Sequence, residues 1–75
     1  MKFKKGDKII TKNKYYDEAY HKGEILYLDV ISETYQVKWP DSRKGVDEYQ
    51  SSTIEENYEL DVKRNRNTFI KNILK

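Results

Sequence analysis

The residues of this chain whose side chains carry out catalysis or bind metals are few and scattered. There is one histidine, His21, in the stretch YHKG, and there is no cysteine. A single histidine without a nucleophile motif does not complete a Ser-His-Asp arrangement, and a chain without cysteine has no thiolate metal site. Gly6, Gly23 and Gly45 lie too far apart to form a phosphate-cradling loop. We therefore expect no catalytic residue, metal site or cofactor, and we predict that the protein is not an enzyme.

Aromatic and basic side chains offer the chemistry of binding instead. The chain has seven tyrosines, two phenylalanines and one tryptophan, and aromatic rings attract cations and stack on bases. Charge is distributed unevenly: residues 1–14 hold six lysines and one acid, residues 15–60 four basic and eleven acidic residues, and residues 61–75 five basic residues and one acid. This pattern indicates a polarised surface, unless the ends neutralise the middle within the fold.

The length of the chain limits how these residues can be positioned. Seventy-five residues form at most one domain, and a chain of this size buries only about 60% of its extended surface. No apolar run approaches the roughly 18 residues of a membrane span, and the N-terminus lacks the apolar region of a signal peptide. With no cysteine to staple a secreted domain, we expect a cytoplasmic location and no contact with membranes.

Turn residues divide the first half of the chain. Gly6-Asp7 is a turn dipeptide, after which Ile9 begins a strand. The polar and aromatic run over residues 11–23 has no clear period and predicts a long loop. The following stretch, GEILYLDVI, is the most apolar strand candidate, and strict alternation places Ile25 and Tyr27 on the same face.

The stretch YQVKWPDSRKGVDEYQ predicts a hairpin. Tyr35, Val37 and Trp39 alternate with polar residues, which is typical of a half-buried antiparallel strand. Pro40 ends this strand because proline cannot donate a hydrogen bond to the ladder. A charged loop follows, and two further strands are expected at residues 46–50 and residues 58–60.

Two helical segments complete the predicted elements. Ser52 with Glu55, or Thr53 with Glu56, fits the S/T-x-x-E capping box and predicts a single helical turn. The C-terminal tail carries one apolar helical stripe, formed by Phe69, Ile70, Ile73 and Leu74. Asn65 or Asn67 is the expected cap of this tail helix. The stripe would pack on the chain's own sheet, on a second copy or on a partner.

These elements predict a mainly β fold, a five-stranded antiparallel barrel over residues 1–62 followed by a basic helical tail over residues 63–75. The segments FKKGDKIIT, KGEILYL, TYQVKWPDS and DEYQSSTIEENYEL, in this order, resemble SH3-like barrels of the Tudor, chromo-barrel and KOW type. The resemblance covers residues 3–62. The composition is also similar to that of small proteins of phages and AT-rich bacteria.

The resemblance implies a binding module. In Tudor-type domains an aromatic cage at the mouth of the barrel holds a methylated lysine or arginine by cation–π attraction. The positions that match the cage, its acid and the nearby loop tip are Tyr15, Tyr16, Tyr20, Trp39, Tyr49, Asp41 or Asp47, Arg43 and Lys44. The alternative for Trp39 and Tyr49 is that both simply belong to the core.

KOW-type barrels commonly bind RNA, which gives a second reading. The basic candidates are Lys4, Lys5, Lys12, Lys14, Lys63, Arg64, Arg66 and Lys71. The acidic middle of the chain argues against this reading because it repels phosphates. We therefore expect first a protein-interaction factor that engages a host or cellular protein, second a nucleic-acid binder, and third a structural part that forms oligomers through the C-terminal helix.

Overall fold

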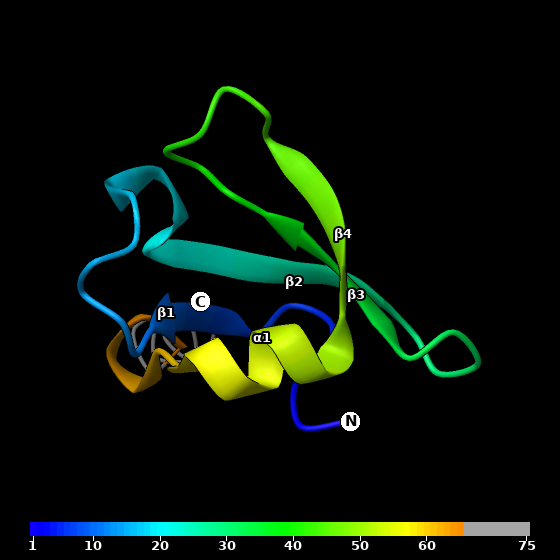
Figure 1. Ribbon diagram of the computed structural model, residues 1–75. Helices are drawn as coiled ribbons and strands as arrows, with labels where there is room; N and C mark the ends of the chain where they lie inside the picture. The colour runs from blue at the N-terminus through cyan, green and yellow to red at the C-terminus, as the bar shows by residue number, and fades with distance from the viewer. Residues whose placement is uncertain (66–75) are drawn as a thin grey trace, which may run out of the picture.

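The structure is a computed structural model, and it describes residues 1–65 of the chain. Five strands and two short helices alternate along the sequence (Figure 1). In chain order they are β1 (Lys8–Thr11), the 3₁₀-helix η1 (Glu18–Tyr20), β2 (Lys22–Asp29), β3 (Thr34–Lys38), β4 (Val46–Gln50), α1 (Ser51–Asn57) and β5 (Tyr58–Leu60). Within this part of the chain, no helix is long and apolar enough to cross a membrane.

All five strands pair antiparallel in one sheet, in the order β4-β3-β2-β1-β5. The prediction of a mainly β fold is therefore confirmed, and the strands expected at residues 46–50 and 58–60 have those bounds. Because α1 joins β4 directly to β5, one short helix links the two ends of the strand order. Figure 1 shows α1 running below β1 and β2, and it contacts β3, β4 and β5. Closure of this sheet into a barrel stays a prediction.

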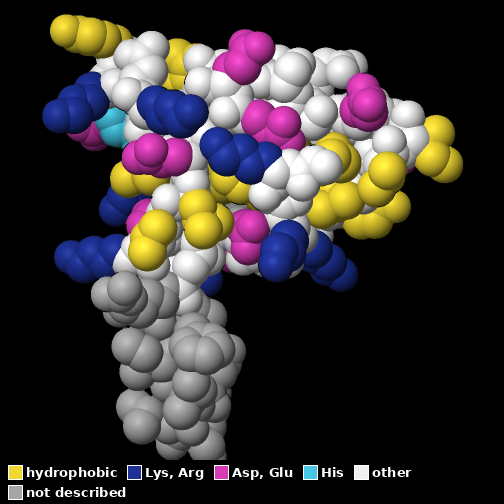
Figure 2. Space-filling model, turned by 90° about the horizontal axis from the view of Figure 1, so that it is seen from below, with side chains coloured by type: hydrophobic (Ala, Val, Ile, Leu, Met, Phe, Trp, Pro, Cys, Tyr) yellow, Lys and Arg dark blue, Asp and Glu magenta, His cyan; other side chains and the backbone are white. Residues whose placement is uncertain are grey.

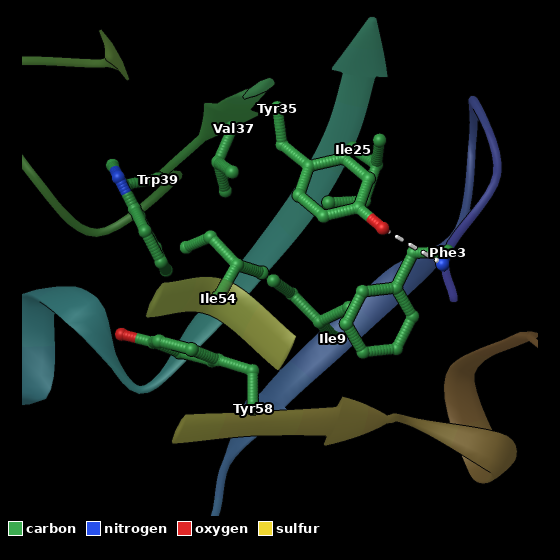
Figure 3. Close-up of a cluster of buried hydrophobic side chains, with 8 residues drawn as sticks. All are labelled: Phe3, Ile9, Ile25, Tyr35, Val37, Trp39, Ile54 and Tyr58. Carbon is green, nitrogen blue, oxygen red and sulfur yellow. Dashed lines mark hydrogen bonds between the residues drawn. The ribbon is translucent and has the colours of Figure 1, made fainter. Parts of the chain in front are cut away.

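The core lies between the sheet and α1, as Figure 3 shows. It consists of Phe3, Ile9, Ile25, Tyr35, Val37, Trp39, Ile54 and Tyr58. The predicted alternation of β3 is confirmed, because Tyr35, Val37 and Trp39 are all buried. The Phe3 ring packs on Tyr35 with 5.9 Å between centroids, and the Phe3 N–H donates to the Tyr35 hydroxyl at 3.0 Å. The segment before β1 is thereby attached to β3.

A bulge in β2 reverses the faces of this strand. Ile25 lies opposite Val37 and Tyr27 lies opposite Gln36, so Leu26 is an extra residue without its own partner. As a result Ile25 is fully buried whereas Tyr27 is 54% exposed. The expectation that these two side chains share a face is therefore wrong, since a one-residue insertion inverts the alternation that follows it.

Helix α1 differs from the prediction in length and in its cap. It spans seven residues, and its N-cap is Gln50, which makes no side-chain cap hydrogen bond. The capping boxes expected from Ser52 or Thr53 are therefore not formed. Instead the first N–H of the helix, that of Ser51, donates to the carbonyl of Glu33 at 2.8 Å. The buried side chain of the helix, Ile54, supplies the packing that stabilises so short an element.

The chain after β5 turns into a helical segment over residues 62–65. Asp61 caps it, because its Oδ1 accepts the N–H of Arg64 at 3.2 Å and its carbonyl accepts the N–H of Asn65 at 3.1 Å. Asn65, one of the two predicted caps, lies inside this helical segment, and the other, Asn67, lies outside the described residues. The apolar stripe predicted for the tail lies outside the described residues.

Arg64 and Asn65 fasten this segment to the sheet. The Arg64 Nη2 donates to the carbonyls of Ile9 at 2.8 Å and Gly23 at 3.1 Å, which face each other across β1 and β2. Its Nε pairs with Asp61 Oδ2 at 2.6 Å. Asn65 accepts from the N–H of Lys8 and donates to its carbonyl, both at 3.0 Å. We call this set of contacts, made by Asp61, Arg64 and Asn65, the C-terminal clasp.

Candidate functional site

A pocket of about 350 Å³ opens where η1, β4, α1 and β5 meet. Four of its seven lining residues are tyrosines and one is an acid. The lining residues are Tyr16, Asp17, Tyr20, Tyr49, Thr53, Ile54 and Tyr58. We call this the tyrosine pocket. Ile54 and Tyr58 belong to the core, and the other tyrosines are half-buried.

Hydrogen bonds fix the loop that carries Tyr16 and Tyr20. The ring Nε2 of His21 lies 2.5 Å from the carbonyl oxygen of Tyr16, and since a carbonyl only accepts, Nε2 carries the proton. Asp17 caps η1 through the N–H of Ala19 at 3.1 Å. The Tyr58 hydroxyl donates to the carbonyl of Tyr20 at 2.7 Å. The wall of the pocket formed by this loop is thus attached to the core.

Trp39 packs against three of the tyrosine rings that line the pocket, on their core side. It is 1% exposed and does not line the pocket. Its ring meets Tyr20 edge-on at 5.4 Å and Tyr49 edge-on at 5.9 Å, and it lies 5.3 Å from the Tyr58 ring. Figure 3 shows the Trp39 ring extending toward Ile54 and Tyr58. The expected alternative, that Trp39 belongs to the core, is therefore correct, while Tyr49 is a pocket residue.

Two hydroxyl groups of the pocket, those of Tyr58 and Tyr49, stay neutral at ordinary pH. Burial raises the pKa of Tyr58 and of Tyr49 above the usual tyrosine value. The Tyr49 hydroxyl accepts a hydrogen bond from Trp39 Nε1 at 3.1 Å, and a hydrogen bond from Tyr49 contributes to the lowered pKa of Asp47. The pocket therefore combines aromatic faces with neutral polar groups.

Three charged groups lie around the pocket mouth. Asp17 is an exposed lining residue. Lys44 Nζ pairs with Asp47 Oδ2 at 2.6 Å. This hydrogen bond raises the pKa of Lys44, to which Tyr49 and Tyr20 also contribute, and it lowers the pKa of Asp47, so both groups are charged at neutral pH. The ion pair is neutral as a whole, which leaves Asp17 as the net charge among these three.

The structure brings together some of the residues predicted for an aromatic cage. Tyr16, Tyr20 and Tyr49 line the tyrosine pocket, and Lys44 and Asp47 pair near it. Tyr15 is 97% exposed and outside the lining. Asp41 and Arg43 are exposed on the loop between β3 and β4 and do not line the pocket either.

Four lining residues were missed from the sequence: Asp17, Thr53, Ile54 and Tyr58. Tyr58 begins the last strand, and its place in a strand-like alternation favours core over site. The only signal at Asp17 is that an aspartate just before a helix is a common cap.

The basic candidates fall into two groups separated by β1. Lys4 and Lys5 precede this strand, while Lys12 and Lys14 follow it. These four side chains and that of Lys63 are exposed. Figure 2 shows basic and acidic side chains interspersed on the face it presents. Arg64 is engaged in the C-terminal clasp, and Arg66 and Lys71 lie outside the described residues.

Comparison of the chain with protein-family models, with curated proteins and with solved structures finds no match. In the described part of the chain, no group of three or more His, Asp or Glu side chains is placed to hold a metal ion. The tyrosine pocket is therefore the candidate functional site of the described residues.

Proposed function

We propose that this protein is a non-enzymatic binding module that engages a protein partner by accepting a cationic side chain, a lysine or arginine and above all a methylated one, in the tyrosine pocket. The observation that carries the proposal is the convergence of four tyrosines from η1's loop, β4 and β5 on one pocket with Asp17 at its edge. The resemblance to SH3-like barrels of the Tudor type supports the same reading.

The physical basis is the attraction between a cation and aromatic faces. Each such contact contributes about 0.5–2 kcal/mol, with the larger values where water is excluded. A volume of about 350 Å³ is at the small end of ligand pockets and suits one side chain rather than a cofactor. Methyl groups lower the hydration of an ammonium ion and add apolar contact with Ile54, so a methylated cation is favoured over a bare one.

The nucleic-acid reading is less well supported. Tyrosine rings also stack on bases, but Asp17 lies at the pocket and Glu18 and Glu48 are exposed on the neighbouring η1 and β4. These carboxylates would repel a phosphate backbone. The basic residues before and after β1 are absent from the lining of the pocket. A protein partner therefore remains the first proposal.

The experiment is a titration with small probes of matched shape. The cationic probe is N-acetyl-trimethyllysine methylamide, and the neutral probe has carbon in place of its ammonium nitrogen. Binding is followed by amide chemical shifts of Tyr20, Tyr49 and Thr53. Two or three cation–π contacts give an expected Kd of about 1 mM for the cation, with at least about tenfold weaker binding of the neutral probe.

Two neighbouring tyrosines give a matched pair of variants. Tyr16→Leu removes a ring of the pocket and is expected to weaken the cation about tenfold. Tyr15→Leu removes an exposed ring outside the pocket and is expected to change nothing. Equal binding of both probes, or shifts that do not saturate at the pocket residues, would contradict the proposal.

A further inference from the structure

We propose that the Lys44–Asp47 ion pair sets the affinity of the tyrosine pocket for cations, because Lys44 neutralises a second carboxylate at its mouth. The inference rests on the proposed function, namely that the pocket accepts a cation. It adds a specificity-determining pair that lies outside the lining residues.

The position of Asp47 follows from the alternation of β4. Asp47 and Tyr49 are half-buried on one face of the strand, whereas Val46, Glu48 and Gln50 are exposed on the other. Residues two apart on one strand face are separated by about 7 Å. Asp47 interacts with the Tyr49 hydroxyl, and since Tyr49 lines the pocket, this carboxylate lies beside the lining residues. Its Oδ1 accepts the N–H of Glu48 at 2.9 Å, which fixes the orientation of the group.

The loop before β4 places Lys44 against this carboxylate. The N–H of Gly45 donates to the carbonyl of Ser42 at 3.2 Å, and the N–H of Val46 donates to the carbonyl of Lys44 at 2.9 Å. Gly45 has a φ of 74°, in the left-handed region that glycine tolerates best. The chain thus turns tightly and brings Lys44 Nζ to 2.6 Å from Asp47 Oδ2, although 61% of the Lys44 side chain remains exposed.

The charge seen by a ligand depends on whether this pair is complete. With the pair intact, Asp17 is the one net charge among the three groups. Without the charge of Lys44, a cation would meet two carboxylates, those of Asp17 and Asp47. Without the charge of Asp47, the ammonium of Lys44 would cancel Asp17. One unit charge at about 7–8 Å changes cation affinity about 2.5-fold in bulk water and about 40-fold at an effective dielectric constant of about 20. Because these groups are open to solvent, we expect a change toward the lower limit, about three- to tenfold.

The test is a double-mutant cycle with the same two probes at low ionic strength. Lys44→Met is expected to strengthen binding of the trimethyllysine probe about three- to tenfold, and Asp47→Asn to weaken it by a similar factor. The double variant is expected to bind like the wild type, because it again has only Asp17. Lys44→Arg keeps the pair and serves as the matched control. Neither substitution is expected to unfold the protein, because 61% of the Lys44 side chain and 33% of the Asp47 side chain are exposed.

Two further readouts separate charge from shape. Binding of the neutral probe should not change in any variant, and 0.5 M salt should remove most of the differences, since the Debye length falls below about 5 Å. If the wild type binds the cation but all four variants bind it equally, this inference is wrong and the proposed function stands. If the wild type does not distinguish the two probes, both are wrong.

Discussion

Gly23 shows how one residue determines the position of the ring behind the pocket. A Cβ at this position would lie 2.8 Å from the Trp39 ring and 2.8 Å from Val37 Cγ1. Both neighbours are fully packed in the core. The absence of a side chain at Gly23 therefore lets Trp39 lie directly against β2, from where it contacts the rings of Tyr20 and Tyr49.

Gly23→Ala is predicted to destabilise the protein by about 1–3 kcal/mol, because an added methyl group overpacks a filled core. Urea unfolding followed by Trp39 fluorescence measures this change. Gly45→Ala is the control, since a Cβ there meets nothing within 4 Å and its cost of about 1 kcal/mol comes from the positive φ. An unchanged Trp39 emission maximum in folded Gly23→Ala would contradict the role assigned to Gly23.

Glu55 and Tyr35 join the N-terminal segment to α1. Glu55 Oε2 accepts the Tyr35 hydroxyl at 2.5 Å and the N–H of Lys2 at 2.8 Å. These bonds hold the pKa of Glu55 below its ordinary value of 4.5. Burial, with the hydrogen bond to Glu55, raises the pKa of Tyr35 to about 12.

The sign of the Glu55 effect determines how stability depends on pH. A carboxyl group whose pKa is lowered by folding stabilises the protein above its unfolded pKa, and this contribution disappears as the pH falls through the folded value. The wild type is therefore predicted to lose stability below about pH 5, and Glu55→Gln should lack part of this loss. Thermal unfolding from pH 7 to pH 3 measures it. The difference should stay below about 1 kcal/mol because the site is open to solvent, and Glu56→Gln, on the exposed side of α1, should behave like the wild type.

Among the elements, the C-terminal clasp has the clearest structural role. Arg64 satisfies two backbone carbonyls on neighbouring strands, one of them that of Gly23. Arg64→Met is predicted to cost about 1–3 kcal/mol, since hydrogen bonds to charged groups are the stronger ones. Urea unfolding and amide exchange at Ile9 and Gly23 measure the effect.

Lys63→Met is the matched control for the clasp, because it removes a neighbouring exposed charge and should change stability by less than about 0.5 kcal/mol. Equal stability of the two variants would show that the clasp contributes nothing. Charge reversal at Arg64 is consequently a poor test of nucleic-acid binding, since it would also disrupt the fold.

An element could be predicted when the residues that determine it lie close together in the sequence, and not when they lie far apart. The strands with alternating residues, β3 above all, were predicted because apolar and polar residues alternate in the sequence when one face of a strand is buried. The bulge at Leu26 was not, because it is set by register against β3. The cap of α1 was mispredicted because the Glu33 carbonyl, far away in sequence, replaces a local cap.

The tyrosine pocket was predictable only in part for the same reason. Tyr16, Tyr20 and Tyr49 were expected only because the resemblance to Tudor-type barrels implies cage residues on the first long loop and the fourth strand. Tyr58 joins them because α1 carries the chain to the far end of the sheet and β5 then pairs with β1. No local sequence pattern predicts that β5 pairs with β1 and brings Tyr58 to the other tyrosines.

At the scale of the whole molecule, Ile54 is the residue through which α1 holds the two ends of the strand order together. It is 1% exposed and belongs both to the core and to the pocket. Ile54→Ala is predicted to cost about 2–5 kcal/mol. That is a large share of the roughly 4–11 kcal/mol expected for a domain of this size.

Denaturant unfolding should place the Ile54→Ala midpoint far below that of the wild type. Ile31→Ala, at a position 96% exposed, is the control and should change the free energy of unfolding by less than about 0.5 kcal/mol. Similar midpoints for the two variants would rule out this role of α1.

The turn between β2 and β3 makes the molecule suited to attachment on a surface. Asp29 Oδ1 accepts the N–H groups of Ile31 at 3.0 Å and Ser32 at 3.1 Å, which gives the turn a defined shape. In Figure 1 this turn and η1 lie at opposite ends of the molecule. Because the chain has no cysteine, Ile31→Cys would create a single thiol for coupling to a sensor chip or a dye. Molecules tethered there would all present the tyrosine pocket to the solution in one orientation.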